Sequence, residues 1–244
     1  MSIYTNKVAL ITGGSRRLGK EIAKLIAECN YDIVLNYFKT PPDMVKSTIE
    51  ELSKNSVEVI PYKADFSKED EIKRIYYYIS DRFKRLDLVV NNAAIFRKVD
   101  FFDINSSIID EFYNTNLKSI VISTIEAAKI MLKNDEKPCK IINIASIGGI
   151  QNWTNFIPYS LSKAGVIKFT FLSAKRLAPD ILVNCISPAT IDMKDEKLEL
   201  DDISTYPMKR YSKVDDIKSL IKFLVLENKY ITGHNFIVDG GKTL

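Results

Sequence analysis

The sequence predicts an α/β fold, in which a doubly wound parallel sheet of about seven strands carries helices on both faces. Three features of the 244 residues support this prediction. Short runs of almost continuous aliphatic residues recur along the chain, an amphipathic segment follows most of them, and a glycine-rich turn joins the first pair. Strands that are apolar along their full length are typical of parallel sheets covered on both sides. Their alternation with helices indicates one open, doubly wound sheet.

The strands are expected where valine, isoleucine and leucine follow one another with little interruption, because β-branched side chains favour extended backbone. Each run is short, which suits a buried strand better than a helix. In chain order, the predicted strands are residues 8–12, 32–37, 57–62, 88–91, 140–144, 181–186 and 235–238.

The helices are expected where apolar residues recur at every third or fourth position. Leu18, Ile22 and Ile26 show this spacing directly after the glycine-rich turn. The predicted helices are residues 18–29, 43–54 and 68–83, a long helical region within 106–132, a segment that contains 159–163, and residues 215–226.

Residues 189–212 break this rhythm, because they form a long, charged segment without a clear strand. Long irregular segments in α/β folds often cover a substrate, so a substrate lid is predicted there. The chain contains no internal linker, repeat or low-complexity segment. Residues 1–244 are therefore expected to form a single domain.

The composition argues against several classes of function. The 35 basic and 31 acidic residues give a net charge of +4 and form no basic block with interleaved aromatic residues, so a nucleic-acid partner is not expected. With one histidine, His234, and no Cys-x-x-Cys motif, neither a metal site nor a histidine-dependent triad is expected. The sequence shows no signal-peptide pattern and no apolar run of membrane-spanning length, so a cytoplasmic protein without a membrane partner is expected.

The glycine-rich turn, residues 12–19 (TGGSRRLG), predicts a dinucleotide site. Glycine permits a tight turn and a close approach of the backbone, and it leaves the amides at the start of the next helix available for a pyrophosphate. Any strand-to-helix turn tolerates glycine. The position of this turn at the first strand–helix junction is what favours a dinucleotide.

The segment after the second strand favours NADP(H) over NAD(H). An NAD site usually places an acidic residue there to bind the ribose 2′-hydroxyl, whereas residues 36–40 (NYFKT) contain no carboxylate. Arg16, Arg17 and Lys39 are expected to converge where a 2′-phosphate would lie, because guanidinium and ammonium groups bind phosphate. Three solvated surface cations would give the same sequence pattern.

Tyr159 and Lys163 are four residues apart in a predicted helix, so their side chains project from the same face. A phenol with an ordinary pKa of about 10 is a poor acid at neutral pH. A neighbouring ammonium favours the phenolate and so makes the proton available for acid–base catalysis. Such pairs also occur by chance on solvated helices, so the pair needs support from other motifs.

Those motifs resemble the short-chain dehydrogenase/reductase family in its compact single-domain form. The family's glycine-rich turn resembles residues 12–19, its Asn-Asn-Ala-Gly motif resembles 91–94, and its C-terminal segment resembles 231–241. The resemblance extends along the whole chain. It implies a Rossmann fold and an NADP-dependent dehydrogenase/reductase that transfers hydride between a nicotinamide and a carbonyl or alcohol.

The resemblance also implies a catalytic tetrad of Asn116, Ser146, Tyr159 and Lys163. Without the other three residues, Ser146 would be interpreted as a turn or capping serine. Within the tetrad, Ser146 is expected to polarise the substrate carbonyl. Tyr159 is expected to donate a proton to the carbonyl oxygen, with its pKa lowered by Lys163. Lys163 is also expected to bind the nicotinamide ribose, and Asn116 to hold a water that returns protons from solvent.

The cofactor contacts that the family motifs imply come from the turns after successive strands, together with the tyrosine–lysine pair. They are Gly13, Ser15, Arg16, Arg17, Leu18, Gly19, Asn36, Tyr37, Lys39, Asp65, Phe66, Asn92, Ala93, Ala94, Tyr159, Lys163, Pro188, Ala189, Thr190 and Ile191.

Several positions depart from the common family pattern. Arg17 replaces the middle glycine of the turn, and Ala94 replaces the last glycine of the Asn-Asn-Ala-Gly motif. Met193 stands where the family often has a threonine that holds the nicotinamide carboxamide, and Thr190 is the alternative source of that hydroxyl.

Two of this chain's residues are similar to the pteridine-reductase branch of the family. In that branch, an arginine at the position of Arg17 faces the cofactor phosphate and the substrate, and an aromatic residue at the position of Phe96 stacks on the pterin ring. Phe96 is equally consistent with a core or loop residue. Ser146 argues against a close match, because some of those enzymes carry aspartate there.

The substrate contacts are expected to be Phe96, Ser146, Trp153, Phe156 and Tyr159, with charged side chains of the predicted lid at the rim. This largely apolar lining favours a hydrophobic ketone or a 3-oxoacyl thioester. A dihydropterin, reduced by a pteridine reductase, is the alternative substrate. A non-catalytic NADP(H)-binding regulator on the same fold is the alternative from another class. Because the family usually forms dimers or tetramers, a homo-oligomer, either a tetramer or a dimer, is expected.

Overall fold

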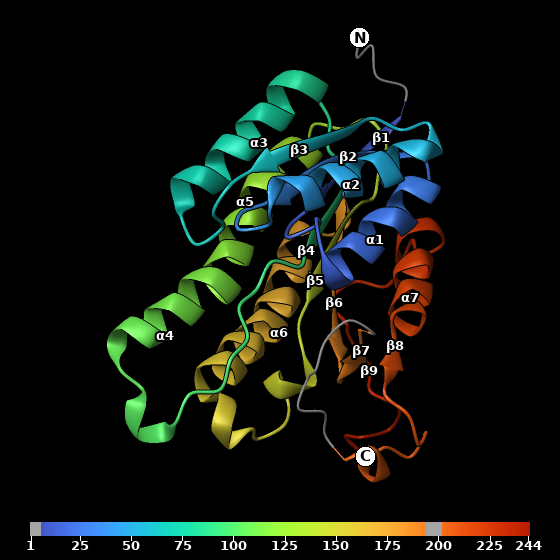
Figure 1. The fold of residues 1–244 in the computed structure, drawn as a ribbon. Helices are drawn as coiled ribbons and strands as arrows, with labels where there is room; N and C mark the ends of the chain where they lie inside the picture. Colours follow the sequence, from blue (N-terminus) through green and yellow to red (C-terminus); the bar gives the residue numbers. More distant parts are fainter. Residues whose placement is uncertain (1–5, 194–201) are drawn as a thin grey trace.

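The computed structural model describes residues 6–193 and 202–244, and its centre is a seven-stranded sheet in the order β3-β2-β1-β4-β5-β6-β9 (Figure 1). Every neighbouring pair of strands in this sheet is parallel. The predicted doubly wound α/β architecture is therefore confirmed. The strands are β1 Lys7–Ile11, β2 Tyr31–Tyr37, β3 Val59–Lys63, β4 Leu88–Asn91, β5 Cys139–Ile144, β6 Ile181–Pro188 and β9 Asn235–Val238.

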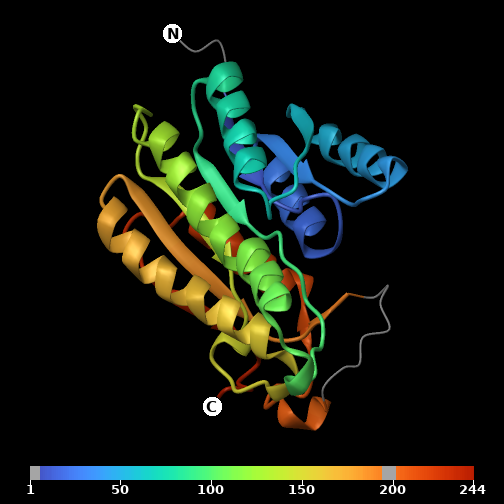
Figure 2. The same cartoon turned by 90° about the vertical axis from the view of Figure 1, so that its left-hand side faces the viewer.

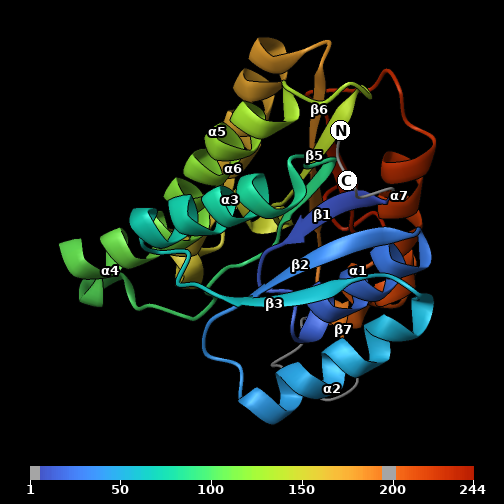
Figure 3. The ribbon, with the colours of Figure 1, turned by 90° about the horizontal axis from the view of Figure 1, so that it is seen from above.

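Helices cover both faces of the sheet. The helices α3, α5 and α6 lie side by side on one face (Figure 2), and α1, α2 and α7 lie on the other (Figure 3). Within the described ranges, no helix is both long and apolar enough to cross a membrane. The helices are α1 Arg17–Glu28, α2 Pro42–Leu52, α3 Glu69–Phe83, α4 Ser106–Phe112, α5 Ser119–Met131, α6 Ile157–Leu177 and α7 Val214–Leu226.

Each face of the sheet has its own apolar core. On one face, Ile75 of α3 and Met131 of α5 pack in a cluster with Val89 of β4. On the other, Ile26 of α1 and Ile221 of α7 belong to a second cluster. All five side chains are fully buried, and burial of each such side chain stabilises the fold by about 1.5–3 kcal/mol. The strands are thus apolar on both sides, as the sequence pattern requires.

The strand order reverses between β1 and β4, and the turns that follow these two strands meet at the carboxyl edge of the sheet. Thr12 follows β1, and its hydroxyl accepts hydrogen bonds from the backbone amides of Asn92 at 2.8 Å and Ala93 at 2.9 Å. The side-chain amide of Asn92 in turn donates to the carbonyl of Thr12 at 2.9 Å. In open α/β sheets, such a reversal point is where ligands bind.

The long helical region predicted within 106–132 is not one α-helix. A π-helical turn, Tyr113–Lys118, separates α4 from α5. This turn places Asn116 in the interior with no exposed surface, where its side-chain amide bonds to the backbone of Ile95. The spacing of apolar residues in the sequence does not predict this π-helical turn, because the turn accompanies a polar contact with a distant segment.

The predicted lid, residues 189–212, contains strand residues at both of its ends, where the sequence shows no clear strand. The short strands β7 Ile191–Asp192 and β8 Ser212–Lys213 pair in parallel. Strands of this length carry no alternation pattern that a sequence can show. The part of the lid that lies outside the described residues is 194–201, with the predicted rim side chains Lys194, Asp195, Glu196 and Lys197.

A series of hydrogen-bonded, buried polar side chains runs along one face of the sheet, near the carboxyl ends of β4 and β5. Tyr76 of α3 bonds to Ser123 of α5 at 2.6 Å, and Ser123 donates to Asn91 of β4 at 2.6 Å. Asn91 donates to Asn143 of β5 at 2.9 Å, and Asn143 donates to Thr170 of α6 at 2.9 Å. None of the five side chains is more than 2% exposed. A buried polar group costs free energy unless it is paired. This series of hydrogen bonds therefore favours one relative placement of three helices and two strands.

We expect Asn143→Ala to lower the free energy of unfolding by about 2 kcal/mol, because the buried amide of Asn91 loses its acceptor. Urea unfolding followed by circular dichroism measures this change. The matched control is Asn55→Ala, since the Asn55 amide bonds the nearby Leu52 carbonyl at a partly exposed position. The control is expected to cost less than about 0.5 kcal/mol. Equal losses in the two variants would contradict the role of the buried chain.

Candidate active site

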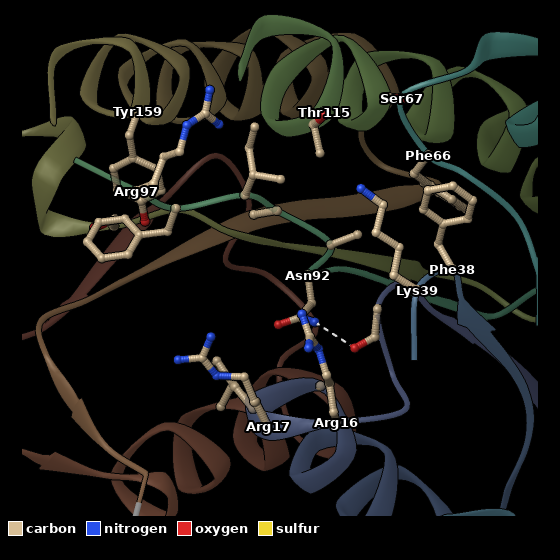
Figure 4. Close-up of a pocket in the computed structure, with 18 of the residues that line it drawn as sticks. Arg16, Arg17, Phe38, Lys39, Phe66, Ser67, Asn92, Arg97, Thr115 and Tyr159 are labelled. Atoms are coloured by element: carbon tan, nitrogen blue, oxygen red, sulfur yellow. Dashed lines mark hydrogen bonds between the residues drawn. The ribbon is translucent and has the colours of Figure 1, made fainter. Parts of the chain in front are cut away.

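One cavity of about 1500 Å³ runs along the carboxyl edge of the sheet (Figure 4). Pockets for a single small molecule usually measure about 300–1,000 Å³, so this cavity is large enough for a cofactor and a substrate together. Most of the predicted site residues line it. The predicted residues in the lining are Gly13, Ser15, Arg16, Arg17, Leu18, Gly19, Asn36, Tyr37, Lys39, Asp65, Phe66, Asn92, Ala93, Ala94, Phe96, Ser146, Trp153, Phe156, Tyr159, Ala189, Thr190 and Ile191.

The glycine-rich turn forms one wall of the cavity and can come close to a ligand. Gly13 has a φ of +61°, which favours glycine. A Cβ atom on Gly19 would lie 2.1 Å from the carbonyl oxygen of Gly13, so only glycine fits between the turn and α1. Arg16, the N-cap residue of α1, makes no side-chain capping hydrogen bond among the described residues, which leaves the helix start suited to an anion.

Two predicted cofactor residues are engaged with the protein itself. The side-chain oxygen of Asn36 accepts from the backbone amide of Gly13 at 3.2 Å, and its nitrogen donates to the Ala64 carbonyl at 3.0 Å. The Ser15 hydroxyl donates to the Thr40 hydroxyl at 2.8 Å. Asn36 and Ser15 therefore hold the glycine-rich turn against β2 and the segment that follows it.

The basic side chains occupy different parts of the cavity (Figure 4). Arg16 and Arg17 extend into it from the start of α1, whereas Lys39 enters from the segment after β2, beside Phe38 and Phe66. Arg17 points away from Lys39 in this view, so the three cations are spread along the cavity rather than gathered at one point. Arg17 also has a φ of +51°, a conformation that costs a residue other than glycine about 1–2 kcal/mol.

At the other end of the cavity, Tyr159 of α6 lies beside Ser146, which follows β5. The Ser146 hydroxyl accepts from the Gly148 amide at 3.0 Å and also bonds the Tyr159 phenol. Burial raises the pKa of Tyr159 to about 12, and the hydrogen bond with Ser146 opposes part of that rise. The phenol thus keeps its proton at neutral pH.

Lys163 and Pro188 are the two predicted cofactor residues that do not line the cavity. Lys163 is 2% exposed, and its Nζ donates to the Ile144 carbonyl at 2.7 Å. Burial lowers its pKa to about 8. The expectation that Lys163 lowers the pKa of Tyr159 is not met in this structure. The pKa of the phenol is raised instead, because the phenol is buried, and the Lys163 Nζ lies 5.7 Å from the centre of the ring.

Asn116 lies behind the cavity wall and is linked to α6. Its Oδ1 accepts from the Ile95 amide at 2.8 Å, and its Nδ2 donates to the Ile95 carbonyl at 3.0 Å and to the Ser162 hydroxyl at 3.1 Å. Ser162 in turn donates to the Tyr159 carbonyl at 2.6 Å. The side chain of Asn116 therefore joins the loop before Phe96 to the helix that carries Tyr159.

Aromatic rings form the wall around Tyr159. The rings of Phe96 and Phe156 are stacked at 4.7 Å, and Phe96 meets the edge of Tyr159 at 4.8 Å. Trp153 lies nearly parallel to Tyr159 at 6.4 Å. Phe96 remains 53% exposed, so it forms the outer edge of this wall. The predicted substrate residues therefore do lie together around the phenol.

The sequence analysis missed several residues in the lining. Phe38 and Thr40 flank Lys39, so the segment after the second strand already indicated where they lie. Arg97 follows Phe96 and forms an ion pair with Glu111 at 2.6 Å. The others carry no motif and reach the cavity only because of the tertiary fold: Ala64, Ser67, Ile95, Lys98, Asn114, Thr115, Asn152, Thr154 and Asn155.

Comparison with known proteins supports the same interpretation. Residues 7–201 match the family model described as short chain dehydrogenase. A 3-oxoacyl-[acyl-carrier-protein] reductase of Synechocystis sp. is 34% identical over 250 residues, which cover 100% of both chains.

Two solved structures share the fold. A short chain dehydrogenase from Burkholderia cenocepacia in complex with NADP has a TM-score of 0.89 and 27% identity, over 98% of each chain. An acetoin dehydrogenase from Enterobacter cloacae has a TM-score of 0.89 and 25% identity, over 98% of this chain and 97% of that one.

The buried Lys163 predicts a pH-dependent difference in stability. Its pKa is about 8 in the folded protein and has a reference value of 10.5, so the burial penalty applies fully below pH 8 and disappears above about 10.5. Without cofactor, the unfolding free energy of the natural chain is therefore expected to rise relative to that of Lys163→Met between these pH values. Chemical unfolding at several pH values measures the difference.

The control for this measurement is Lys168→Met, which removes an exposed lysine from the same helix. Its unfolding free energy should follow that of the natural chain over the whole pH range. If Lys163→Met also runs parallel to the natural chain, the buried ammonium does not have the lowered pKa.

Proposed function

The chain belongs to the short-chain dehydrogenase/reductase family, and from this premise we propose that it reduces a hydrophobic ketone or a 3-oxoacyl thioester with NADPH. The observation that carries the proposal is the arrangement of the cavity of about 1500 Å³. A glycine-rich turn with basic side chains lies at one end, and the Ser146–Tyr159 pair lies at the other within an aromatic wall. A nicotinamide cofactor bound along this cavity supplies the hydride.

The residues around the substrate carbonyl then have distinct tasks. Ser146 and Tyr159 both present hydroxyl groups at the cavity, where they can hydrogen-bond one carbonyl oxygen. Because the phenol of Tyr159 keeps its proton at neutral pH, it can donate that proton to the oxygen as negative charge develops there. The carbonyl gains a hydride at carbon and a proton at oxygen, which gives the alcohol.

Lys163 and Asn116 act behind these two hydroxyls. With a pKa of about 8, Lys163 is mainly an ammonium at neutral pH, and its charge favours proton loss from the adjacent phenol when the substrate oxygen takes the proton. The side-chain amide of Asn116 bonds the backbone of Ile95 and the hydroxyl of Ser162, so we assign it to holding the loop and the helix together. We also propose that Asn116 holds the water that returns protons from solvent.

Two observations support NADPH rather than NADH. The segment after β2 brings Lys39 into the cavity and contributes no carboxylate, and Arg16 enters from the start of α1. A cation that faces the adenosine ribose attracts a 2′-phosphate, whereas a carboxylate there would repel it. The NADP complex of the Burkholderia cenocepacia relative agrees with this assignment.

The aromatic wall supports a hydrophobic substrate. Phe96, Trp153 and Phe156 surround the phenol of Tyr159, and apolar surface of this kind binds acyl or ring carbons. The 3-oxoacyl reductase of Synechocystis sp. and the acetoin dehydrogenase of Enterobacter cloacae both carry names that imply carbonyl or alcohol substrates.

We also propose that residues 189–212 cover the substrate and that the chain assembles into dimers or tetramers.

Pteridine reduction is the second candidate. The side chain of Arg17 extends into the cavity (Figure 4), as expected of an arginine that faces both cofactor and substrate, and this favours pteridine reduction. Phe96, at the outer edge of the aromatic wall, is placed to stack on a flat ring. A regulator that binds NADP(H) without catalysis is the third candidate, and the presence of both active-site hydroxyls disfavours it.

We expect the purified protein to oxidise NADPH faster with acetoacetyl thioesters than with dihydrobiopterin. In Tyr159→Phe the turnover is expected to fall by about 10²–10⁴-fold, because the proton donor is lost, while NADPH affinity changes less than about twofold. Absorbance at the NADPH band and a fluorescence titration measure the two quantities.

The matched control for this measurement is Tyr230→Phe, which changes a tyrosine that is 93% exposed. Faster turnover with dihydrobiopterin would favour the pteridine reductase. NADPH binding without turnover in a broad carbonyl panel, unaffected by Tyr159→Phe, would favour the regulator.

We expect Lys39→Met to weaken NADPH binding by about tenfold and NADH binding by less than twofold, because one charge-assisted bond to the 2′-phosphate is lost. Dissociation constants from fluorescence titration test this expectation. Lys46→Met, which removes an exposed lysine of α2, is the control and should leave both constants unchanged. Equal effects of Lys39→Met on the two cofactors would contradict NADP(H) selectivity.

A further inference from the structure

We propose that the C-terminal residues 239–244 position the substrate wall through the contact between Lys242 and Tyr206, so that Lys242 is a positioning residue for substrate binding. This proposal rests on the proposed function for its kinetic consequence and on the structure for the contact itself. The two segments lie next to each other at the lower end of the molecule (Figure 1, Figure 2).

Tyr206 is the single buried side chain in an otherwise exposed segment. Residues 202–205 and 207–209 are exposed, whereas Tyr206 has no exposed surface. A large ring that is buried inside an exposed segment serves as its anchor, because burial of an aromatic side chain stabilises one placement of the segment. The position of residues 202–209 therefore depends strongly on Tyr206.

The ring of Tyr206 is buried against residues next to the active site. It belongs to one apolar cluster with Ile147 and Ala189, against which Trp153 packs. Ile147 directly follows Ser146, Ala189 lines the cavity, and Trp153 is part of the wall around Tyr159. A shift of Tyr206 would therefore displace the residues that pack against it on the substrate side of the cavity.

The C-terminal tail also contacts Tyr206. The Nζ of Lys242 lies 4.5 Å from the centre of the Tyr206 ring and donates to its hydroxyl at 3.3 Å. An ammonium over an aromatic face is attracted to the ring quadrupole, and the attraction is stronger when the pair is shielded from water. Lys242 thereby satisfies a hydroxyl group on a fully buried side chain.

The tail is itself held in a defined conformation. The carboxylate of Asp239, which is 7% exposed, accepts from the Gly241 amide at 2.9 Å, the Thr243 amide at 2.7 Å and the Thr243 hydroxyl at 2.7 Å. The Met208 amide donates to the Gly240 carbonyl at 3.2 Å, which adds a backbone link to the anchored segment. Because these hydrogen bonds fix the turn at Asp239, the side chain of Lys242 is held where it can position the ring of Tyr206.

The test compares Lys242→Gln with the natural chain in two measurements. Hydrogen exchange followed by mass spectrometry is expected to become about three- to tenfold faster at the amides of Met208 and Lys209, because the anchor is loosened. With acetoacetyl thioester as the probe, KM is expected to rise about three- to tenfold, while kcat and the NADPH dissociation constant stay within about twofold. A merely structural role would change all three together with the melting temperature.

Three further variants make the test specific. Lys242→Arg should restore exchange and KM, because a guanidinium also binds an aromatic face. Tyr206→Phe keeps the ring and loses the hydroxyl, so it should give a smaller rise in KM than Lys242→Gln. Lys229→Gln removes an exposed lysine outside the tail and should change neither quantity.

Unchanged exchange in Lys242→Gln overturns the proposal, and so does a failure of Lys242→Arg to restore the natural values. If the natural chain reduces no carbonyl, the proposed function fails. The exchange measurement then still decides whether the tail holds Tyr206, because it needs no substrate.

Discussion

The hydrogen bond between the side chains of Asn91 and Asn143 is the contact on which the site geometry depends. It joins β4 to β5 in register, at a point where both strands are about to end. The next residue after Asn91 is Asn92, which supports the turn after β1. The next residue after Asn143 is Ile144, whose carbonyl holds the amine of Lys163. A slip of one strand against the other would separate the glycine-rich turn from Lys163 and the Ser146–Tyr159 pair.

The same contact illustrates why the cores alone do not specify this structure. Apolar side chains such as those of the two clusters pack acceptably in more than one arrangement, because the hydrophobic effect has no direction. The polar chain from Tyr76 to Thr170 is satisfied in one arrangement only, since each donor needs its acceptor at hydrogen-bond distance. Apolar burial thus supplies much of the stability, and the polar chain selects the register.

Much of the fold could be predicted from the sequence, because parallel strands and amphipathic helices leave strong periodic patterns. The end of the cavity that we propose for the cofactor was also predictable as a place, since its glycines and cations occur in short local motifs. The π-helical turn at Asn116 was not readable, because it follows from a contact with Ile95 in another segment. The raised pKa of Tyr159 was missed for a similar reason: a sequence shows that a lysine is near, but not how deeply the phenol is buried.

The all-parallel sheet has a consequence for how this site comes into being. A parallel pair cannot be closed by a tight hairpin, so each pairing waits for a crossover connection to be completed. The hydrogen bond between Thr12 and Asn92 spans 80 positions, and the bond from the Ala189 amide to the Val238 carbonyl needs the last strand of the chain. Such long-range contacts slow folding, since the entropy of loop closure is lost before the contacts form. A ribosome-bound chain that lacks its final strand therefore has the glycine-rich turn but not yet the complete cavity.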